Sequence, residues 1–385
     1  MVVSVSQPAT DVGAAVLRDG GNAVDAAVAV GFALAVTWPE AGNIGGGGFM
    51  MIAPGPKQSP VCVDYRETAP AAAKADMFSE GTDYLGHEVV GTPGTVAGFA
   101  LAHERYGNLP WKRLVEPAVK LAAEGFAIDA ALAEGLNELL VETQSEEFAE
   151  FQRVFARPDG EPWQSGDTLV QPDLASTLQL IAEEGPPAFY RGAIAEKLTQ
   201  EMELGDGLIT LADLREYTAK TRQPIHGTFH EFDIYGAPPP SSGGIVVVEV
   251  LNILEQLDLS TYERWSPEAV HLVIESGRRA YLDRARHLGD PDFVSIPEFL
   301  TSKKYAQELA AEIDRQRATS SLELASEMEI AGEGDSTTHF CVVDGDGMGV
   351  SNTYTIESSW GSRVVVRGAG FLLNNEMTDF NHRPG

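Results

Sequence analysis

The segment from Ala23 to Trp38 restricts the possible folds of this chain most strongly, because most of its residues are apolar. Asn22 stands where the N-cap of a helix is expected, Asp25 follows at the third helical position, and Pro39 ends the pattern. The segment contains a carboxylate and is shorter than the ~20 residues that span a bilayer. We therefore predict a helix buried in the core of a folded domain.

A buried strand and several further helices are expected around this helix. After the glycine-rich segment Gly42–Gly48, the apolar run Phe49–Ile52 is short enough to be a buried strand. A dinucleotide-binding loop needs a strand before its glycines and a helix after them, and here the order is reversed. Helical periodicity returns in five later segments, Gly94–Tyr106, Trp111–Glu124, Leu174–Glu184, Ile245–Leu257 and Pro267–Arg286.

Two segments without periodicity follow. Pro238–Gly244 has three prolines and then serines and glycines, which predicts a rigid connector. The acidic segment Glu323–Glu333 lacks a pattern and is predicted to be mobile. Strand character resumes in His339–Val343 and Met348–Ile356, which predicts a β-hairpin.

This hairpin places Thr337 in a position to do chemistry. With a three-residue loop, Asp344 faces Met348 and Thr337 faces Thr355, whereas a loop of two or four residues would shift that register. If the Ser336–Thr337 bond is cut, the new α-amine titrates near about pH 8 and can act as general base for its own hydroxyl. Strand propensity alone would also explain a threonine pair at this point.

The charge of the chain excludes two classes of partner. The 385 residues include 57 Asp and Glu against 27 Lys and Arg, a formal net charge of −30. Nucleic acids and anionic membrane surfaces need clustered basic residues, so we expect no nucleic acid and no membrane insertion. The excess of carboxylates suggests a saline habitat, in which salt screens their repulsion.

The two cysteines point to neither metal nor disulfide chemistry. Cys62 and Cys341 are too few and too far apart for a zinc spacing or a disulfide framework, and they are expected to be small apolar side chains. No cofactor is needed, since a nucleophile of this kind carries its own base. The segment before Ala23 has no signal-peptide pattern, which leaves the compartment open.

Several motifs occur in a fixed order along the chain. They are Gly20–Ala27, Ile44–Phe49, Asp64–Pro70, Gly91–Gly94, Pro239–Gly244, Gly334–Phe340, Asn352–Thr355 and Gly370–Phe380. Together they resemble the γ-glutamyltranspeptidase family over essentially the whole sequence. The resemblance implies an α+β fold, the four-layer αββα sandwich of the N-terminal-nucleophile hydrolases. It also implies one intertwined domain, with 1–336 as the large-subunit portion and 337–385 as the start of the small subunit.

The resemblance also implies roles for individual residues. Thr337 would be the residue of autoprocessing and the nucleophile, with Thr355 assisting it. Arg66 would bind the α-carboxylate of the γ-glutamyl group, a task that suits a planar guanidinium with two parallel donors. Glu376 and Asp379 would bind its α-ammonium group. Without the resemblance these three charges would be read as a surface ion pair and solvated loop residues.

The sequence departs from the family at two points. Glu357, which the resemblance places among the substrate-binding residues, stands where many members have asparagine. The family's small subunit also continues past Gly385 with a Ser-Ser pair and a Gly-Gly pair, which bind the carboxylate and form the oxyanion hole; Ser241–Gly244 matches a different motif. Loss of one oxyanion donor typically costs ~100–1,000-fold in rate.

The expected activity is γ-glutamyl transfer. Glutathione or another γ-glutamyl compound would be the donor, and water, an amino acid or a peptide the acceptor, with large and small subunits from one precursor. Two alternatives stay open. One is a related acylase acting on cephalosporin or glutaryl side chains or on poly-γ-glutamate, and the other is a truncated chain that folds without turnover.

Overall fold

The computed structural model describes residues 1–78, 84–325 and 337–380. Contacts within the chain divide it into two compact units. The first contains the described residues of Met1–Ser59, Val63–Thr221 and Gly334–Gly385, and the second those of Pro60–Cys62 and Arg222–Glu333.

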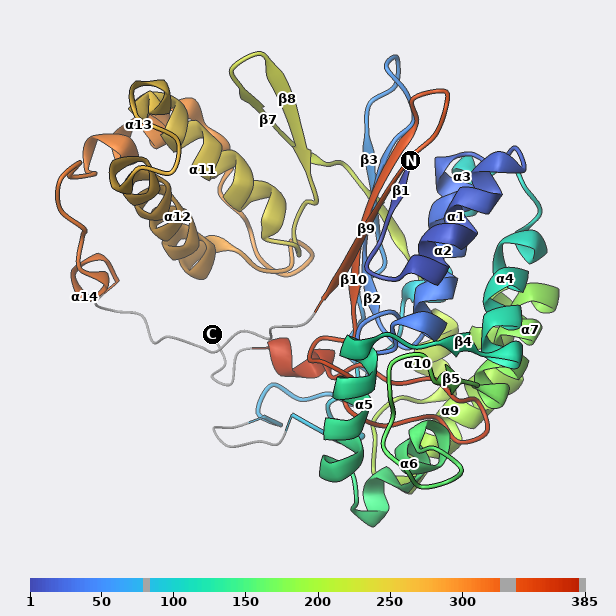
Figure 1. Cartoon of the computed structure of the whole chain (residues 1–385). Coiled ribbons are helices and arrows are strands. Elements are labelled where there is room, and N and C mark those ends of the chain that lie inside the picture. The colour runs from blue at the N-terminus through green and yellow to red at the C-terminus, as the bar shows by residue number, and fades with distance from the viewer. Residues whose placement is uncertain (79–83, 326–336, 381–385) are drawn as a thin grey trace. The chain divides into compact units, whose positions relative to one another are not determined.

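A six-stranded sheet forms the centre of the first unit, in the order β1-β9-β10-β2-β3-β6. Its strands are β1 Val2–Val3, β9 Thr338–Val343, β10 Gly349–Thr355, β2 Gly47–Ala53, β3 Val61–Asp64 and β6 Lys220–Arg222. β10 is antiparallel to both of its neighbours, β9 and β2. Strands from the two ends of the sequence therefore lie side by side (Figure 1).

The predicted core helix is α2, Ala23–Thr37, and all of its residues are buried. Its first turn has a capping box, in which Asn22 Oδ1 accepts from Asp25 N at 2.9 Å and Asp25 Oδ2 accepts from Asn22 N at 3.0 Å. α2 packs against β9 and β10 and against the helices α1 Gln7–Arg18 and α4 Trp111–Glu124. An added Cβ at Gly31 would lie 2.3 Å from the Phe99 ring, so glycine permits this close packing.

The other predicted helices are present. They are α3 Thr95–Tyr106, α4, α7 Pro172–Glu184, α11 Gly243–Leu257 and α12 Pro267–His287. The first unit also has helices and short strands that the sequence did not lead us to expect, namely α1, β4 Phe126–Ala127, α5 Ala130–Glu142, η1 Glu146–Phe148, α6 Ala149–Phe155, β5 Thr168–Leu169, α8 Pro186–Tyr190, α9 Ala193–Leu204 and α10 Leu211–Glu216.

The second unit has its own apolar core, which includes Ile253, Leu257, Leu272 and Ala306. It consists of the hairpin β7 Ile225–Phe229 and β8 Phe232–Gly236, followed by α11, η2 Leu259–Thr261, α12, η3 Glu298–Thr301, α13 Lys303–Ala311 and α14 Ser321–Leu324. Of the segment predicted to be mobile, residues 326–333 lie outside the described ranges.

The combination of helices and a central sheet confirms the α+β class. In β9, the side chains of Thr338, Phe340 and Val342 are buried on the side of the sheet that α2 covers. His339 in the same strand and Thr337 just before it alternate with these residues and are exposed. In the described ranges no helix is both long and apolar enough to cross a membrane. The boundary between 1–336 and 337–385 stays a prediction, because Ser336 lies outside the described residues.

Candidate active site

The register of the β9–β10 hairpin brings two hydroxyl groups together. Thr338 pairs with Tyr354, and Asp344 N donates to Met348 O at 3.1 Å, so the three-residue loop is confirmed. One step beyond the first pair, Thr337 faces Thr355, as the sequence predicts. Thr337 Oγ1 donates to Thr355 Oγ1 at 3.5 Å.

Thr355 is held in place by its surroundings. Its side-chain oxygen accepts from Glu357 N at 2.9 Å and donates to Glu357 O at 3.3 Å. Its carbonyl accepts from Asn43 Nδ2 at 2.8 Å. The residue is buried. A hydroxyl fixed in this way can orient the neighbouring hydroxyl of Thr337.

Arg66 lies just after β3, and its backbone is fixed on both sides. Its N–H donates to Asp64 Oδ1 at 3.0 Å, and its carbonyl accepts from Tyr217 Oη at 2.8 Å. Its Nη2 contacts Glu376 and lies 3.4 Å from Asp379 Oδ2. The cation and the two carboxylates that the resemblance assigns to one head group therefore lie together.

The loop that carries those carboxylates is anchored by Asn374, which the sequence analysis missed. Glu376–Asp379 form the short helix η4. Asn374 Oδ1 accepts from Gly91 N at 2.9 Å and from Glu376 N at 3.0 Å. Its Nδ2 donates to the carbonyls of Gly45 and Gly91, each at 2.8 Å.

Asn375 and Glu357 connect this loop to the threonine pair. Asn375 Oδ1 accepts from Ser358 N at 3.1 Å, and its Nδ2 donates to Ser358 Oγ at 3.0 Å. Ser358 Oγ also donates to the Glu357 carboxylate. Burial raises the pKa of Glu357, and the charge of Asp379 raises it further. Glu357 thus belongs to the same cluster of side chains.

Glu67 is a second residue that the sequence analysis missed. Its side chain is 2% exposed and follows Arg66 directly. Burial raises its pKa to about 7. Its position inside the quoted motif Asp64–Pro70 was the available signal, but the motif alone does not reveal the burial.

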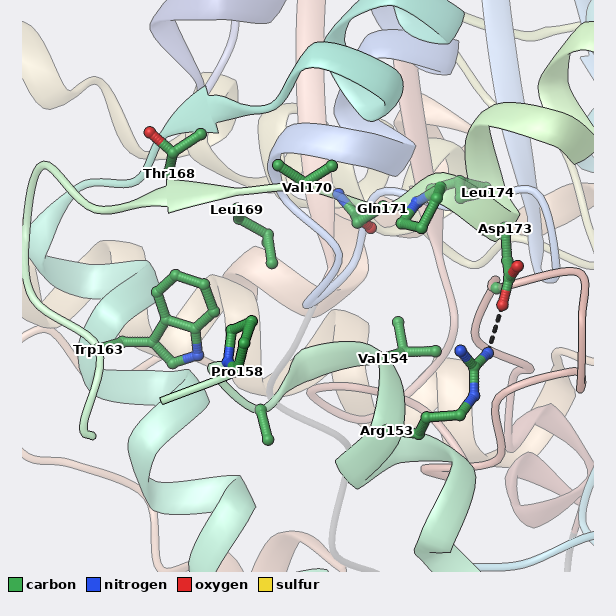
Figure 2. Close-up of a pocket in the computed structure, with 13 residues that line it drawn as sticks. Arg153, Val154, Pro158, Trp163, Thr168, Leu169, Val170, Gln171, Asp173 and Leu174 are labelled. Carbon is green, nitrogen blue, oxygen red and sulfur yellow. Dashed lines mark hydrogen bonds and ion pairs between the residues drawn. The ribbon is translucent and has the colours of Figure 1, made fainter. Parts of the chain in front are cut away.

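A cavity of about 200 Å³ lies elsewhere in the first unit (Figure 2). α6, β5 and the start of α7 contribute to its lining, and Arg153 contacts Asp173 at one side. None of the predicted site residues in the described ranges lines it. Across those same ranges, no three His, Cys, Asp or Glu side chains are grouped so as to hold a metal ion.

Known proteins match this chain over nearly its whole length. The model of the family Gamma-glutamyltranspeptidase matches residues 9–385. The glutathione hydrolase proenzyme of Escherichia coli (strain K12) is 46% identical over 393 residues, which is 100% of this chain and 67% of that protein. The acylase ACY 1 proenzyme of Pseudomonas sp. (strain SE83) is 37% identical, over 100% of this chain and 70% of that protein.

Solved structures agree with these relatives. Helicobacter pylori gamma-glutamyltranspeptidase has a TM-score of 0.79 and 38% identity, over 85% of this chain and 94% of that chain. Cephalosporin acylase from Bacillus halodurans has a TM-score of 0.87 and 26% identity, over 100% of this chain and 70% of that chain. The fold is therefore that of the N-terminal-nucleophile hydrolases. The family match over 9–385 and the 46% identity to a curated relative show that this chain is an enzyme that belongs to the γ-glutamyltranspeptidase family.

Proposed function

We propose that this enzyme transfers the γ-glutamyl group of glutathione or another γ-glutamyl amide to water or to an amino-acid acceptor. The observation that carries the proposal is the pairing of Thr337 with Thr355, whose side-chain oxygens lie 3.5 Å apart. The relatives named glutathione hydrolase proenzyme support glutathione as a donor.

Processing at the Ser336–Thr337 bond would prepare the nucleophile. Thr337 Oγ attacks the carbonyl carbon of Ser336, an ester replaces the amide, and water hydrolyses the ester. The products are a new carboxylate on Ser336 and a free α-amine on Thr337. This amine titrates near about pH 8, so at neutral pH a fraction of it can accept a proton.

Turnover then proceeds through an ester on Thr337. The α-amine takes the hydroxyl proton while Oγ attacks the γ-carbonyl carbon, and the C–N bond breaks as the leaving amine takes up the proton. Water or an amino acid attacks the γ-glutamyl ester in the same way and regenerates the hydroxyl. Thr355 would hold the Thr337 hydroxyl in line for both attacks.

The charged cluster would bind the amino-acid head of the donor. Arg66 already contacts two carboxylates, so a further anion alone would be held weakly. A zwitterion avoids this difficulty, because its carboxylate pairs with Arg66 while its ammonium group pairs with Glu376 and Asp379. A site that has one guanidinium beside two carboxylates favours an intact α-amino acid over a simple carboxylic acid.

A related acylase activity is the second candidate, favoured by Glu357 in place of asparagine and by the similarity to the cephalosporin acylase structure. Kinetics with γ-glutamyl and glutaryl anilides separate the two, because the glutaryl group lacks the ammonium. A γ-glutamyl transferase is expected to prefer the γ-glutamyl anilide by about tenfold or more, because the glutaryl group leaves the carboxylates of the site without their ammonium partner. Equal or reversed rates would favour the acylase.

The substitution Thr337→Ala tests the nucleophile. We expect it to abolish both processing and turnover, whereas Thr338→Ala, on the opposite face of the strand, should still allow processing. A denaturing gel with N-terminal sequencing should show two pieces for the wild type, the smaller starting at Thr337. A cut and active Thr337→Ala protein would contradict the assignment, and an uncut wild type would support a chain without turnover.

A further inference from the structure

A buried carboxyl group lies on the catalytic face of the sheet, and the proposed function gives it no role. A Cβ atom added to Gly47 would lie 2.5 Å from Glu67 Oε2, so this oxygen lies directly over the backbone of β2. Gly47 pairs with Thr355 in the sheet. Residues directly opposite one another in antiparallel strands point to the same face. Glu67 Oε2 therefore lies on the face that carries Thr337 and Thr355.

The carboxyl group of Glu67 is not stabilised as an ordinary ion pair. Among the described residues, neither of its oxygens has a hydrogen-bond partner. Its closest cationic contact is Arg66 Nη1, 3.6 Å from Oε2, which is too long for a hydrogen bond. The other terminal nitrogen, Arg66 Nη2, contacts Glu376 and Asp379. A buried carboxyl group with no hydrogen-bond donor and only a distant cation is unfavourable in its charged form.

The charges around Glu67 act on its pKa in both directions, and burial outweighs them. Burial is the largest influence and raises the pKa of Glu67 to about 7, although Arg66 opposes it. The carboxylates of Asp379 and Asp64 raise this pKa further. Two buried phenols, Tyr190 and Tyr217, also interact with the charge of Glu67, and burial raises their own pKa values. Glu67 is therefore expected to change its charge within the neutral pH range.

We propose that Glu67 is a positioning residue that controls the access of a substrate carboxylate to Arg66. As an uncharged acid it leaves Nη1 available for the α-carboxylate of the donor. As a carboxylate it attracts Nη1 and repels the donor. This inference rests on the proposed role of Arg66. It adds that donor binding is coupled to protonation of Glu67: a bound α-carboxylate favours the protonated form of Glu67, so binding takes up a proton from solution.

The charge of Glu67 can be measured without turnover. Infrared difference spectra of the processed, full-length enzyme between about pH 5.5 and about pH 8.5 should show a protonated carboxyl band that disappears with a midpoint near 7. This band should be missing in Glu67→Gln and present in the control Glu104→Gln, which replaces an exposed side chain of α3. A wild-type spectrum identical to that of Glu67→Gln would overturn the proposal.

Steady-state kinetics test the link to Arg66. For the wild type, KM for a γ-glutamyl anilide is expected to rise severalfold between about pH 6 and about pH 8, with a smaller change in kcat. Glu67→Gln should flatten this rise in KM, and Glu104→Gln should keep it. An unchanged rise in Glu67→Gln would refute the role of Glu67.

Two further measurements keep the outcomes distinguishable. If Arg66→Ala leaves KM unchanged, the proposed function itself fails; if it raises KM while Glu67→Gln keeps the wild-type profile, only the role of Glu67 fails. Calorimetric titration with a non-hydrolysable γ-glutamyl analogue in two buffers of different ionisation enthalpy needs no variant. The titration should show proton uptake on binding near neutral pH. The absence of proton uptake would count against the proposal.

Discussion

Glu357 combines a left-handed backbone with a partly buried carboxyl group. Its φ is 76°, a conformation that few residues other than glycine, asparagine and aspartate adopt readily. Its backbone N–H and C=O both bond to the Thr355 hydroxyl. The backbone of Glu357 therefore fixes the Thr355 hydroxyl whatever side chain stands at 357.

Glu357→Asn is expected to stabilise the protein by about 0.5 kcal/mol at neutral pH, because asparagine tolerates this backbone. The gain should be smaller near about pH 4, because the folded-state pKa of Glu357 is raised. The protonated Glu357 side chain therefore contributes stability to the wild type below its unfolded-state pKa, and this contribution is lost as the pH rises through the folded-state pKa. Thermal unfolding at the two pH values checks this. Glu357→Val should destabilise at both, and equal stability of the wild type and the asparagine variant at both pH values would refute the prediction.

At the scale of elements, the glycines before β2 let it approach the end of β10. A Cβ atom added to Gly46 would lie 2.1 Å from Thr355 O and 2.9 Å from Asn43 Oδ1. Both atoms belong to the network that holds Thr355. Any side chain at position 46 would have to displace the backbone of Thr355.

Gly46→Ala is therefore expected to cost about 2–4 kcal/mol of stability and to lower kcat. Gly349→Ala, at the other end of β10, is the matched control, since nothing lies within 4 Å of its added Cβ. It should change stability by about 0.5 kcal/mol or less. Denaturant unfolding of both variants provides the comparison, and similar stabilities would contradict the packing described above.

The elements with local signals could be predicted from the sequence. α2 has its cap, its apolar run and its terminating proline within one segment, and the threonine pair depends only on the loop length of one hairpin. α5 was missed although its N-cap residue Asp129 is a local signal. Asn374 could not be predicted, since its partners Gly45 and Gly91 are far away in the sequence and only the folded chain brings them together.

For the whole molecule, the net charge of −30 sets the response to salt. Acidic side chains outnumber basic ones by 57 to 27, so the chain carries a large excess of negative charge. Their mutual repulsion destabilises the compact state and is screened over a shorter distance as salt increases.

The midpoint of thermal unfolding is expected to rise when sodium chloride increases from about 0.1 M to about 1 M, because the Debye length falls from about 10 Å to about 3 Å. A variant with several exposed glutamates changed to glutamine should respond less. Calorimetry on both proteins measures the difference. A midpoint that does not change with salt would rule out the proposed adaptation to a saline habitat.

The strand order β1-β9-β10-β2 has a consequence for the fate of the cut chain. β9 and β10 follow the predicted cleavage point, whereas β1 and β2 precede it and border the hairpin on either side. If that bond is cut, the fragment that begins at Thr337 would remain between β1 and β2 of the other fragment, hydrogen-bonded to each. Cleavage at this point would create a new N-terminus without separating the two fragments. Dissociation would require breaking the hydrogen bonds between β9 and β1 and between β10 and β2.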